Sequence, residues 1–546
     1  MKTPEDNSCL LEVNNLSVEY RLPSEIVHAA KKVSFTLTRG EAIGLVGESG
    51  SGKTSVALAV LGLIQSPGRI TSGSIRFEGK KVTSLSTKAW QSIRGRDMAM
   101  VFQGSAQALT PTARIGQLFL QTFRSHGLKE SRAEFRKRAL DLLTQVRIPR
   151  PEEVFKRYPF ELSGGMCQRV MIALGLALEP KLLIADEPTA GLDVLAQIEL
   201  IDLINDLREK TGISLIVISH DLGFVARIAT RIAVMYRSEI IEDQPVNALL
   251  RSPRYEYSRK LVSASQDLAN HKLKTAPTAD SSIFIELKNV YKKYRTIGGF
   301  FGNHRADVEA VKDATLSLKE GESLGIVGHS GAGKTTLAKL ILGLLLPTRG
   351  DIRLEGQKLD PSNLKIYRNL QMISQYPAKV LDPRMPVGRI IREPLDHFRV
   401  YTAEQRNQRV ETLLNQVGLA MEYWDRYPHQ LSGGEQQRVC IARALALSPK
   451  HLICDEPVSS LDLIFQIQIL KLLAGLQEEY GLTLIMISHD LRVVRSLCEY
   501  IMVIENGRIV EQAPTQTLFE NPRHAHSRLL MQAHTHLQLD VAYMQK

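Results

Sequence analysis

Short apolar runs of strand length alternate with longer helix-like stretches along most of the chain. The run AIGLVGES leads into a glycine-rich turn, after which a helix is predicted from Lys53. Residues 182–186 (LLIAD) and 214–221 (SLIVISHD) are short apolar runs that end in polar side chains. Buried strands that end in this way are typical of a mainly parallel sheet with its ligands at the carboxyl ends of the strands. The charge-rich, helix-like stretch between Gln103 and Leu162 predicts a separate helical lobe.

The chain repeats this arrangement, because four motifs occur twice in the same order. The later motifs are separated by identical distances in the two copies. We therefore expect two tandem α/β domains, each with a mainly parallel sheet core and a helical subdomain. The paired motifs are GESGSGKT (47–54) and GHSGAGKT (328–335), LSGGMCQR (162–169) and LSGGEQQR (431–438), IADEP (184–188) and ICDEP (453–457), and ISHD (218–221 and 487–490).

A change of pattern marks the boundary between the copies. Beyond Leu261, residues 263–282 form SASQDLANHKLKTAPTADSS, a polar, proline-containing segment that is typical of a linker. The strand-like run IFIELKNV then restarts the pattern at Ile283. The sequence predicts a first domain at residues 1–264, a linker at 265–282 and a second domain at 283–546.

Composition and charge narrow the class of protein. With 44% hydrophobic and 23% charged residues the chain is globular, and its apolar stretches fall well short of the ~20 residues that a membrane helix needs. The amino terminus lacks the pattern of a secretory signal, so a cytosolic protein is expected. The net charge of +11 is scattered along the chain and does not select a partner by itself. Five widely spaced cysteines argue against disulfides or a cysteine-bound metal and favour reduced, packed thiols.

The pattern G-x-x-x-x-G-K-[ST] after a strand predicts a phosphate-binding loop in each copy. In such a loop backbone N–H groups surround the phosphates, and the following helix presents its positive end to them. Lys53 and Lys334 are predicted to reach the β- and γ-phosphates, and the hydroxyls of Thr54 and Thr335 to bind Mg²⁺. Two matches in the same context make a chance origin negligible. The chain is therefore expected to bind ATP and Mg²⁺.

IADEP and ICDEP each place two carboxylates at the end of a buried strand. Asp186 and Asp455 are predicted to hold the metal, directly or through water. Glu187 and Glu456 are the predicted general bases, which polarise the attacking water. Two acidic residues after an apolar run more often show only that a strand ends at the protein surface. Here the acidic pair follows a phosphate loop in the chain, which favours the catalytic interpretation.

The LSGG segments resemble the signature sequence of ABC-transporter ATPases, and the motif order of the whole chain is similar to that family. In that family two nucleotide-binding domains pack head to tail, and each ATP lies between the phosphate loop of one domain and the signature of the other. The resemblance implies two composite sites, both of them intact. The implied signature donors are Ser432, Gly433 and Gly434 for the Lys53 site, and Ser163, Gly164 and Gly165 for the Lys334 site.

Further positions follow from the same resemblance. Gln103 and Gln375 match the Q-loop glutamine, which senses Mg²⁺ and the transmembrane partner. His220 and His489 match the switch histidine that contacts the γ-phosphate, and they are counted with the catalytic residues. A histidine that ends a buried strand is usually structural, but identical spacing in two copies favours function.

The weaker matches concern an aspartate and an aromatic residue in each copy. Asp193 and Asp462 match the D-loop aspartate. Tyr20 and Tyr294 are the best matches for the aromatic side chain that stacks on adenine, although Tyr291 competes with Tyr294. The remaining predicted nucleotide-binding positions lie in the two phosphate loops and are Gly47, Ser49, Gly50, Gly52, Ser55, Gly328, Ser330, Gly331, Gly333 and Thr336.

The two copies resemble the two ATPase subunits of the oligopeptide, dipeptide and nickel importers, fused into one chain. The similarity lies around each signature and in GGFFGN (298–303), REPLDHF (392–398) and the segments that close each copy. Cys167 stands where the family usually has arginine, and the carboxyl-terminal cysteine cluster of many peptide importers is absent. Peptides, nickel and metal chelates therefore all remain open as cargo. Two His-x-His pairs, His524/His526 and His534/His536, could bind a metal but are expected to belong to a solvated tail.

The resemblance implies the ATP-hydrolysing motor of an ABC importer. Its implied partners are two integral-membrane permease subunits and a separate substrate-binding protein, with no nucleic acid and no obligate homodimer. The implied location is the cytoplasmic face of a bacterial inner membrane, with attachment through the permeases only. The alternative is a soluble, ribosome-binding ABC translation factor. A short uncharged linker, and GLD and SLD in place of Asn-His-Leu-Asp, argue against that alternative.

Overall fold

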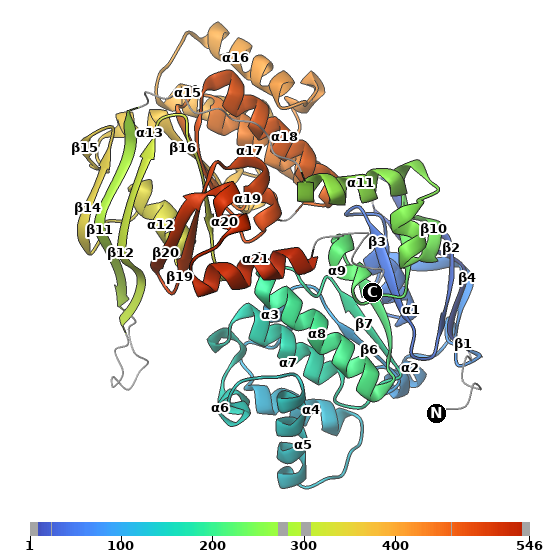
Figure 1. Cartoon of the computed structure of the whole chain (residues 1–546). Helices are drawn as coiled ribbons and strands as arrows, with labels where there is room; N and C mark the ends of the chain where they lie inside the picture. Colours follow the sequence, from blue (N-terminus) through green and yellow to red (C-terminus); the bar gives the residue numbers. More distant parts are fainter. Residues whose placement is uncertain (1–8, 23–24, 271–281, 296–306, 460, 538–546) are drawn as a thin grey trace. The chain divides into compact units, whose positions relative to one another are not determined.

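We describe a computed structural model, which covers residues 9–22, 25–270, 282–295, 307–459 and 461–537. The chain forms two compact domains, built mainly from residues 9–192 and 196–265 and from residues 282–536. Each domain has a four-stranded antiparallel sheet, a six-stranded mainly parallel sheet and a set of helices (Figure 1). Within these described residues, no helix has the length and apolar character needed to cross a membrane.

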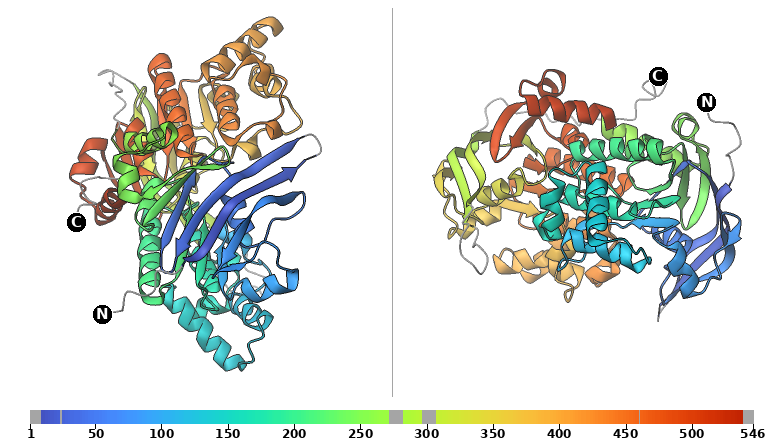
Figure 2. Two further views of the ribbon diagram at one scale, coloured as in Figure 1. Left: turned by 90° about the vertical axis from the view of Figure 1, so that its right-hand side faces the viewer. Right: turned by 90° about the horizontal axis from the view of Figure 1, so that it is seen from below.

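The two sheets of the first domain differ in strand direction. The antiparallel sheet has the order β2-β1-β4-β5, and its long strands are plain in the left view of Figure 2. The other sheet has the order β10-β9-β3-β8-β7-β6 and is parallel except for its edge strand β10. The strands are β1 (Cys9–Arg21), β2 (Ile26–Thr38), β3 (Ala42–Gly47), β4 (Gly68–Phe77), β5 (Lys80–Lys81), β6 (Met98–Val101), β7 (Leu182–Asp186), β8 (Ser214–Ile218), β9 (Arg231–Tyr236) and β10 (Glu239–Pro245).

The second domain repeats this topology. Its antiparallel sheet has the order β12-β11-β14-β15, and its mainly parallel sheet has the order β16-β17-β18-β13-β19-β20. The sequence predicted the parallel sheets but not the antiparallel ones. The strands are β11 (Ile283–Arg295), β12 (Asp307–Lys319), β13 (Ser323–Val327), β14 (Arg349–Leu354), β15 (Gln357–Lys358), β16 (Leu370–Ile373), β17 (His451–Asp455), β18 (Thr483–Ile487), β19 (Tyr500–Glu505) and β20 (Arg508–Pro514).

The main core of each domain lies around the helix that follows the phosphate loop. In the first domain, apolar residues of α1 (Lys53–Val60) share a core with Leu11 and Ile75 of the antiparallel sheet and Ile184 of the parallel sheet. The helix α12 (Lys334–Ile341) has the same place in the second domain. Burying apolar side chains on both sides fixes this helix, and with it the loop that begins it.

The helical lobe predicted between Gln103 and Leu162 is present, and its α4 and α5 extend away from the sheets (Figures 1 and 2). The second domain has its counterpart in α14 to α16. The remaining helices of the first domain are α2 (Thr87–Ile93), α3 (Ser105–Ala108), α4 (Ile115–Ser125), α5 (Arg132–Gln145), α6 (Pro151–Lys156), α7 (Gly164–Gly175), α8 (Val194–Thr211), α9 (Leu222–Ala226), α10 (Val246–Arg251) and α11 (Glu256–Asn270). Those of the second are α13 (Leu364–Asn369), α14 (Pro377–Val380), α15 (Val387–His397), α16 (Ala403–Gln416), α17 (Gly433–Leu445), α18 (Leu463–Tyr480), α19 (Leu491–Leu497), α20 (Thr515–Glu520) and α21 (Ala525–Leu537).

The linker and the His-x-His segment, which follow the two domain cores, both differ from what the sequence suggests. Helix α11 continues to Asn270, so the start of the expected linker is helical, and most of the rest of the linker and GGFFGN lie outside the described residues. The expectation of a solvated His-x-His tail is wrong for two of its four histidines. The side chains of His526 and His534 are buried, because helix α21 packs its apolar face on the domain. His536 is exposed on the same helix, and His524 precedes the helix and is partly exposed.

Candidate functional site

The phosphate loops begin at buried strands and end at helices, as predicted. In the first domain all six residues of β3 are buried, and α1 starts at Lys53. The Lys53 ammonium group is buried and donates hydrogen bonds to the carbonyls of Gly47, at 2.8 Å, and Glu48, at 2.7 Å. Lys334 does the same in the second domain, with Gly328 at 2.7 Å and His329 at 3.0 Å. Each lysine is thus held across its own loop.

The last glycine of each loop is required by its surroundings. Gly52 has a φ of 97°, and a Cβ there would lie 1.8 Å from the carbonyl oxygen of Ala29 on β2. Gly333 has a φ of 106°, and its Cβ would lie 2.2 Å from the carbonyl oxygen of Ala310. The loop therefore lies directly against the antiparallel sheet, at a distance that only glycine allows.

Asp186 ends the fully buried strand β7 and is itself buried. Burial raises the pKa of Asp186 to about 6; the hydroxyl of Thr54 and the charge of Lys53 oppose this shift, and the charge of Glu187 adds to it. One carboxylate oxygen, Oδ1, is buried without a hydrogen-bond partner. A buried carboxyl group in this condition is suited to a cation.

The second domain has the same arrangement at the end of β17. The hydroxyl of Thr335 donates a hydrogen bond of 3.5 Å to Asp455 Oδ1. Burial raises the pKa of Asp455, and the charge of Glu456 adds to this effect. The predicted metal-binding pairs, Thr54 with Asp186 and Thr335 with Asp455, are therefore brought together in both domains.

The glutamate that follows each aspartate adopts a left-handed backbone conformation. The φ angle is 46° at Glu187 and 49° at Glu456, and each backbone N–H still donates to the neighbouring strand, at Ile218 and Ile487. Glutamate rarely occupies this region, and such conformations cluster at functional sites. The turn directs the glutamate side chain away from the line of the strand.

The glutamate of the first domain faces the predicted switch histidine. His220 Nδ1 lies 2.9 Å from Glu187 Oε2, and the hydroxyl of Ser219 lies 3.5 Å from the same oxygen. Burial lowers the pKa of His220, but the carboxylate of Glu187 outweighs burial and leaves that pKa above its usual value. The spacing of the ISHD motif predicted the histidine but missed Ser219, although it belongs to the same repeated motif.

The glutamate of the second domain has a further neighbour. His489 Nδ1 lies 3.1 Å from Glu456 Oε1, and the amide of Gln375 donates a 2.6 Å hydrogen bond to Glu456 Oε2. Burial raises the pKa of Glu456, but His489 and Lys334 outweigh it and leave that pKa below the usual value. The pKa of His489 is raised in turn, because Glu456 outweighs the effect of burial. The side chains of Glu456, His489 and Gln375 thus form one hydrogen-bonded cluster.

Gln103, the counterpart of Gln375, is exposed after strand β6, so the two domains differ at this position. The signature serines lie on other elements. Ser163 caps α7 and Ser432 caps α17, each accepting a hydrogen bond from the backbone of the first helical turn. Both serines and the glycines after them, Gly164 and Gly433, are exposed at these helix starts. The helix starts at Gly164 and Gly433 are therefore accessible to a ligand.

The signature segments, residues 162–169 and 431–438, differ at two positions. In the second domain Glu435 accepts hydrogen bonds from the N–H and the hydroxyl of Ser432, whereas Met166 stands at the equivalent place in the first. Cys167 is buried, and its thiol points to the carbonyl of Pro159 at 3.4 Å. Its counterpart in the second domain, Gln436, donates a hydrogen bond of 2.9 Å to the equivalent carbonyl, that of Pro428. Cys167 therefore keeps a packing role with a weaker hydrogen bond.

The structure distinguishes between the competing tyrosines. Tyr20 pairs with Val27 near the end of β1, and Tyr294 pairs with Val308 at the same place in β11. Tyr291 lies three residues earlier and pairs with Arg349 instead. Tyr294 is thus the structural counterpart of Tyr20, and its side chain is 38% exposed, whereas Tyr20 packs partly on the core.

The two predicted D-loop aspartates stand at helix starts. Asp462 is buried and caps α18, accepting a hydrogen bond from the N–H of Phe465 at 3.3 Å. Asp193 directly precedes α8. The sequence did not single out Asp221 and Asp490, whose carboxylates cap α9 and α19. They follow the switch histidines, and each fixes the turn in which its histidine lies.

Comparison with known proteins identifies the family. The ABC transporter family profile matches residues 30–190 and 311–459, which contain both phosphate loops. This chain belongs to the ABC transporter family. It carries two ABC domains in tandem and is an ATPase of the kind that couples ATP hydrolysis to transport.

Similar proteins occur in several bacteria. The chain is 37% identical to the glutathione import ATP-binding protein GsiA of Escherichia coli O157:H7, over 97% of this chain and 90% of that protein. It is also 37% identical to GsiA of Pectobacterium atrosepticum, over 96% of this chain and 89% of that protein. Among solved structures, cbiO1 from Clostridium perfringens, part of the ABC transporter complex cbiONQ, is 27% identical with a TM-score of 0.38. That match covers 44% of this chain and 92% of cbiO1.

Proposed function

We propose that this chain is the ATP-binding subunit of a bacterial ABC importer and that its cargo is a small peptide. The similarity to glutathione import proteins over nearly the whole chain is the observation that carries the proposal. Glutathione is a tripeptide, so these relatives favour peptides over the nickel ions and metal chelates that the sequence also leaves open. They also favour transport over the translation-factor alternative.

The residues of each domain support a division of roles in ATP hydrolysis. Lys53 and Lys334 would bind the β- and γ-phosphates, together with the N–H groups of the glycine-rich loops. Glu187 and Glu456 would accept a hydrogen bond from the attacking water and orient it in line with the γ-phosphate. His220 and His489 lie within 3.1 Å of these carboxylates and would hold them in position.

The residues present also fit Mg²⁺. Asp186 Oδ1 is a buried acceptor without a partner, and Thr54 supplies a hydroxyl beside the same carboxyl group. Asp455 and Thr335 form the equivalent pair in the second domain. Oxygen donors of this kind are those that Mg²⁺ prefers. When bound, Mg²⁺ would neutralise charge on the phosphate oxygens.

The family resemblance further supports two composite sites. Ser432, Gly433 and Gly434 would complete the site of Lys53, and the first signature would complete the site of Lys334. The exposed helix starts at Ser163 and Ser432 are suited to this task, because they present a positive helix end to a phosphate.

The transport role is tested by the partners of the chain. We expect two membrane permeases and a substrate-binding protein to co-purify with the tagged chain from detergent extracts of its native cells, as identified by mass spectrometry. The permeases would hold the chain at the cytoplasmic face of the inner membrane. A Lys53→Ala/Lys334→Ala variant should retain the same partners, because it alters only phosphate contacts. Ribosomal proteins without a permease would overturn the proposal.

The cargo is tested with the complete transporter in proteoliposomes. We expect glutathione or another small peptide, presented by the binding protein, to stimulate ATP hydrolysis and to accumulate inside the vesicles. The lysine double variant is the control and should show neither effect. Stimulation by Ni²⁺ or a nickel chelate, but not by peptides, would contradict a peptide cargo and leave the importer assignment intact.

A further inference from the structure

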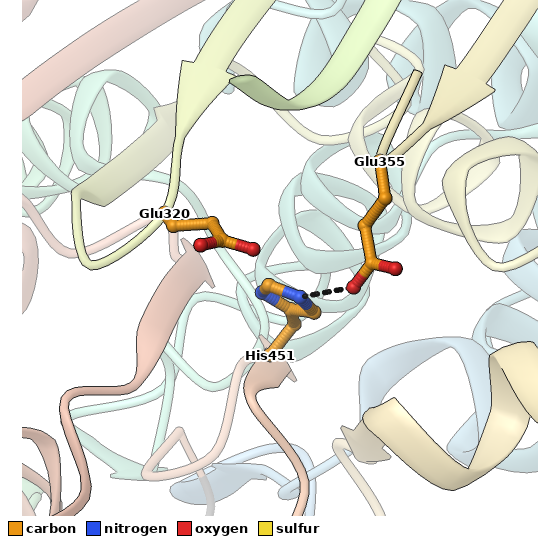
Figure 3. A group of neighbouring side chains, drawn as sticks. All are labelled: Glu320, Glu355 and His451. Carbon is orange, nitrogen blue, oxygen red and sulfur yellow. Dashed lines mark hydrogen bonds and ion pairs between the residues drawn. The ribbon is translucent and has the colours of Figure 1, made fainter. Parts of the chain in front are cut away.

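The described part of the second domain contains a group of potential metal ligands remote from its phosphate loop. Glu320 follows β12, Glu355 lies in the turn between β14 and β15, and His451 opens β17. One ligand atom from each of these side chains lies within 4.8 Å of the other two. The two carboxyl groups approach the imidazole ring from opposite sides (Figure 3). Three segments that are distant in sequence thus converge on one point.

His451 is under-satisfied for a buried polar side chain. It is 2% exposed, and its ring stacks on Phe284 with centroids 3.4 Å apart. Its Nδ1 atom has no hydrogen-bond partner, and its Nε2 atom lies 3.5 Å from Glu355 Oε1, a long contact. Burial lowers the pKa of His451 to about 3, with Lys450 acting in the same direction. The imidazole is therefore neutral near pH 7, and a lone pair is available to a metal.

The first domain has different residues at the positions equivalent to these three. The equivalent positions are those of Arg39, Glu78 and Leu182. Arg39 directly follows strand β2, Glu78 lies in the turn after β4, and Leu182 begins β7, as Glu320, Glu355 and His451 do at the equivalent strands. There Arg39 pairs with Glu78, and Lys181 lies 2.8 Å from Glu78 Oε2. In the first domain, two cationic side chains thus pair with the carboxylate of Glu78 and connect the two sheets at this place.

The second domain replaces the arginine cation with a second carboxylate. Glu320 and Glu355 carry two negative charges at one place, where the first domain has Glu78 alone with its two cations. Lys450, the counterpart of Lys181, is exposed and supplies one positive charge near the group. Like charges this close are unfavourable unless a cation lies between them. A histidine in place of Leu182 adds a neutral nitrogen ligand at the same point.

We propose that Glu320, Glu355 and His451 form a binding site for a divalent cation of the Zn²⁺, Ni²⁺ and Co²⁺ class. Imidazole together with carboxylates favours these ions over Mg²⁺ and Ca²⁺, which prefer oxygen ligands alone. In a tetrahedral zinc site, ligand atoms lie about 3.3 Å from one another, so separations within this group must contract by up to about 1.5 Å. Glu355 is exposed and Glu320 is partly so, which leaves both side chains free to move that far.

The bound metal would join the two sheets of the second domain. Glu320 and Glu355 directly follow strands β12 and β14 of the antiparallel sheet, and His451 begins a strand of the parallel sheet. Asp455 ends that same strand, so the metal and the nucleotide would lie at opposite ends of β17. The site is therefore expected to stabilise the domain and to take no part in the chemistry of hydrolysis.

The test uses the full chain and Zn²⁺ as the probe. After chelator treatment, zinc binding is measured by equilibrium dialysis and elemental analysis, and stability by thermal unfolding. The key variant is Glu320→Arg, which restores the Arg39–Glu78 pairing of the first domain and should therefore fold. We expect it to bind one zinc ion per chain fewer than the wild type. Zinc should raise the unfolding temperature of the wild type but not of this variant.

Control variants separate this site from other zinc ligands. Glu78→Gln alters the equivalent glutamate of the first domain and should leave zinc binding unchanged. His536→Ala tests the His-x-His segment, and it should not abolish the difference between wild type and Glu320→Arg. His451→Leu, which copies Leu182, should also lose one zinc ion. Equal zinc binding by the wild type, Glu320→Arg and His451→Leu would overturn the proposal, whatever the protein transports.

Discussion

His489 Nδ1 lies 3.1 Å from Glu456 Oε1, and the matching pair in the first domain, His220 and Glu187, is separated by 2.9 Å. In both domains the histidine lies two residues after the end of one strand, and the glutamate directly follows the neighbouring strand. Each carboxylate is thus held before any substrate arrives. The glutamate of the second domain is held more tightly, because Gln375 also donates to it at 2.6 Å.

Replacing either glutamate should impair hydrolysis while leaving nucleotide binding intact. Glu187→Gln and Glu456→Gln keep the size of the side chain but remove the base, a role that typically contributes about 10²–10⁴-fold to the rate. We expect each single variant to lose most of its ATP turnover in a steady-state phosphate-release assay. ATP binding, measured by titration calorimetry, should persist. Full turnover in either single variant would exclude two working sites.

The pairing of Glu456 with His489 should be visible in the pH dependence of hydrolysis. His489 helps to hold the pKa of Glu456 below its usual value, against the effect of burial. In His489→Ala that pKa rises, so the base is protonated up to a higher pH. The acid limb of the rate profile should therefore move to higher pH. The measurement compares the pH profile of His489→Ala with that of the wild type in the phosphate-release assay.

A control for this shift is His397→Ala, since His397 is exposed on α15, away from the site. Its pH profile should match that of the wild type. An unchanged acid limb in His489→Ala would show that the histidine does not act through the glutamate.

The sequence predicted which side chains meet at the carboxyl ends of the parallel strands, because their positions depend on local motifs. Lys53 begins a helix, Asp186 ends a strand and His220 lies two residues after a strand, and the repeat gave a second copy of each motif. The contact between Gln375 and Glu456 could not be foreseen, because both domains have the glutamine but only one makes the bond. The pairing of the strands shows that Tyr294, and not Tyr291, is the structural counterpart of Tyr20.

What the sequence missed depends on contacts between distant segments. The antiparallel sheets alternate polar and apolar residues weakly and have bulges, so their pairing was not evident. The group of Glu320, Glu355 and His451 has no motif and comes together only through the fold. His526 and His534 were expected in solvent because a polar segment gives no sign of the surface that covers one face of its helix.

Magnesium-dependent ATP binding at the first site should weaken below about pH 6. Asp186 has a pKa raised to about 6, so below that pH a proton occupies the carboxyl group that the metal requires. If one proton is displaced, affinity should fall about tenfold per pH unit below 6. Calorimetry in a Lys334→Ala background isolates this site. Asp186→Asn should bind Mg²⁺–ATP weakly at all pH values, without this slope, and the same slope in that variant would rule out Asp186 as its origin.

The two glycines of the first phosphate loop offer a comparison of backbone strain with steric clash. Gly50 and Gly52 both have positive φ angles, 82° and 97°, so alanine costs about 1–2 kcal/mol at either position through the backbone alone. A Cβ at Gly50 meets no atom within 4 Å, whereas one at Gly52 would lie 1.8 Å from the Ala29 carbonyl oxygen. Because that neighbour is backbone of β2, it cannot turn away as a side chain could. We therefore expect Gly52→Ala to lower the urea midpoint and the ATP affinity well beyond Gly50→Ala. Equal losses in the two variants would show that close approach to β2 is not what requires glycine here.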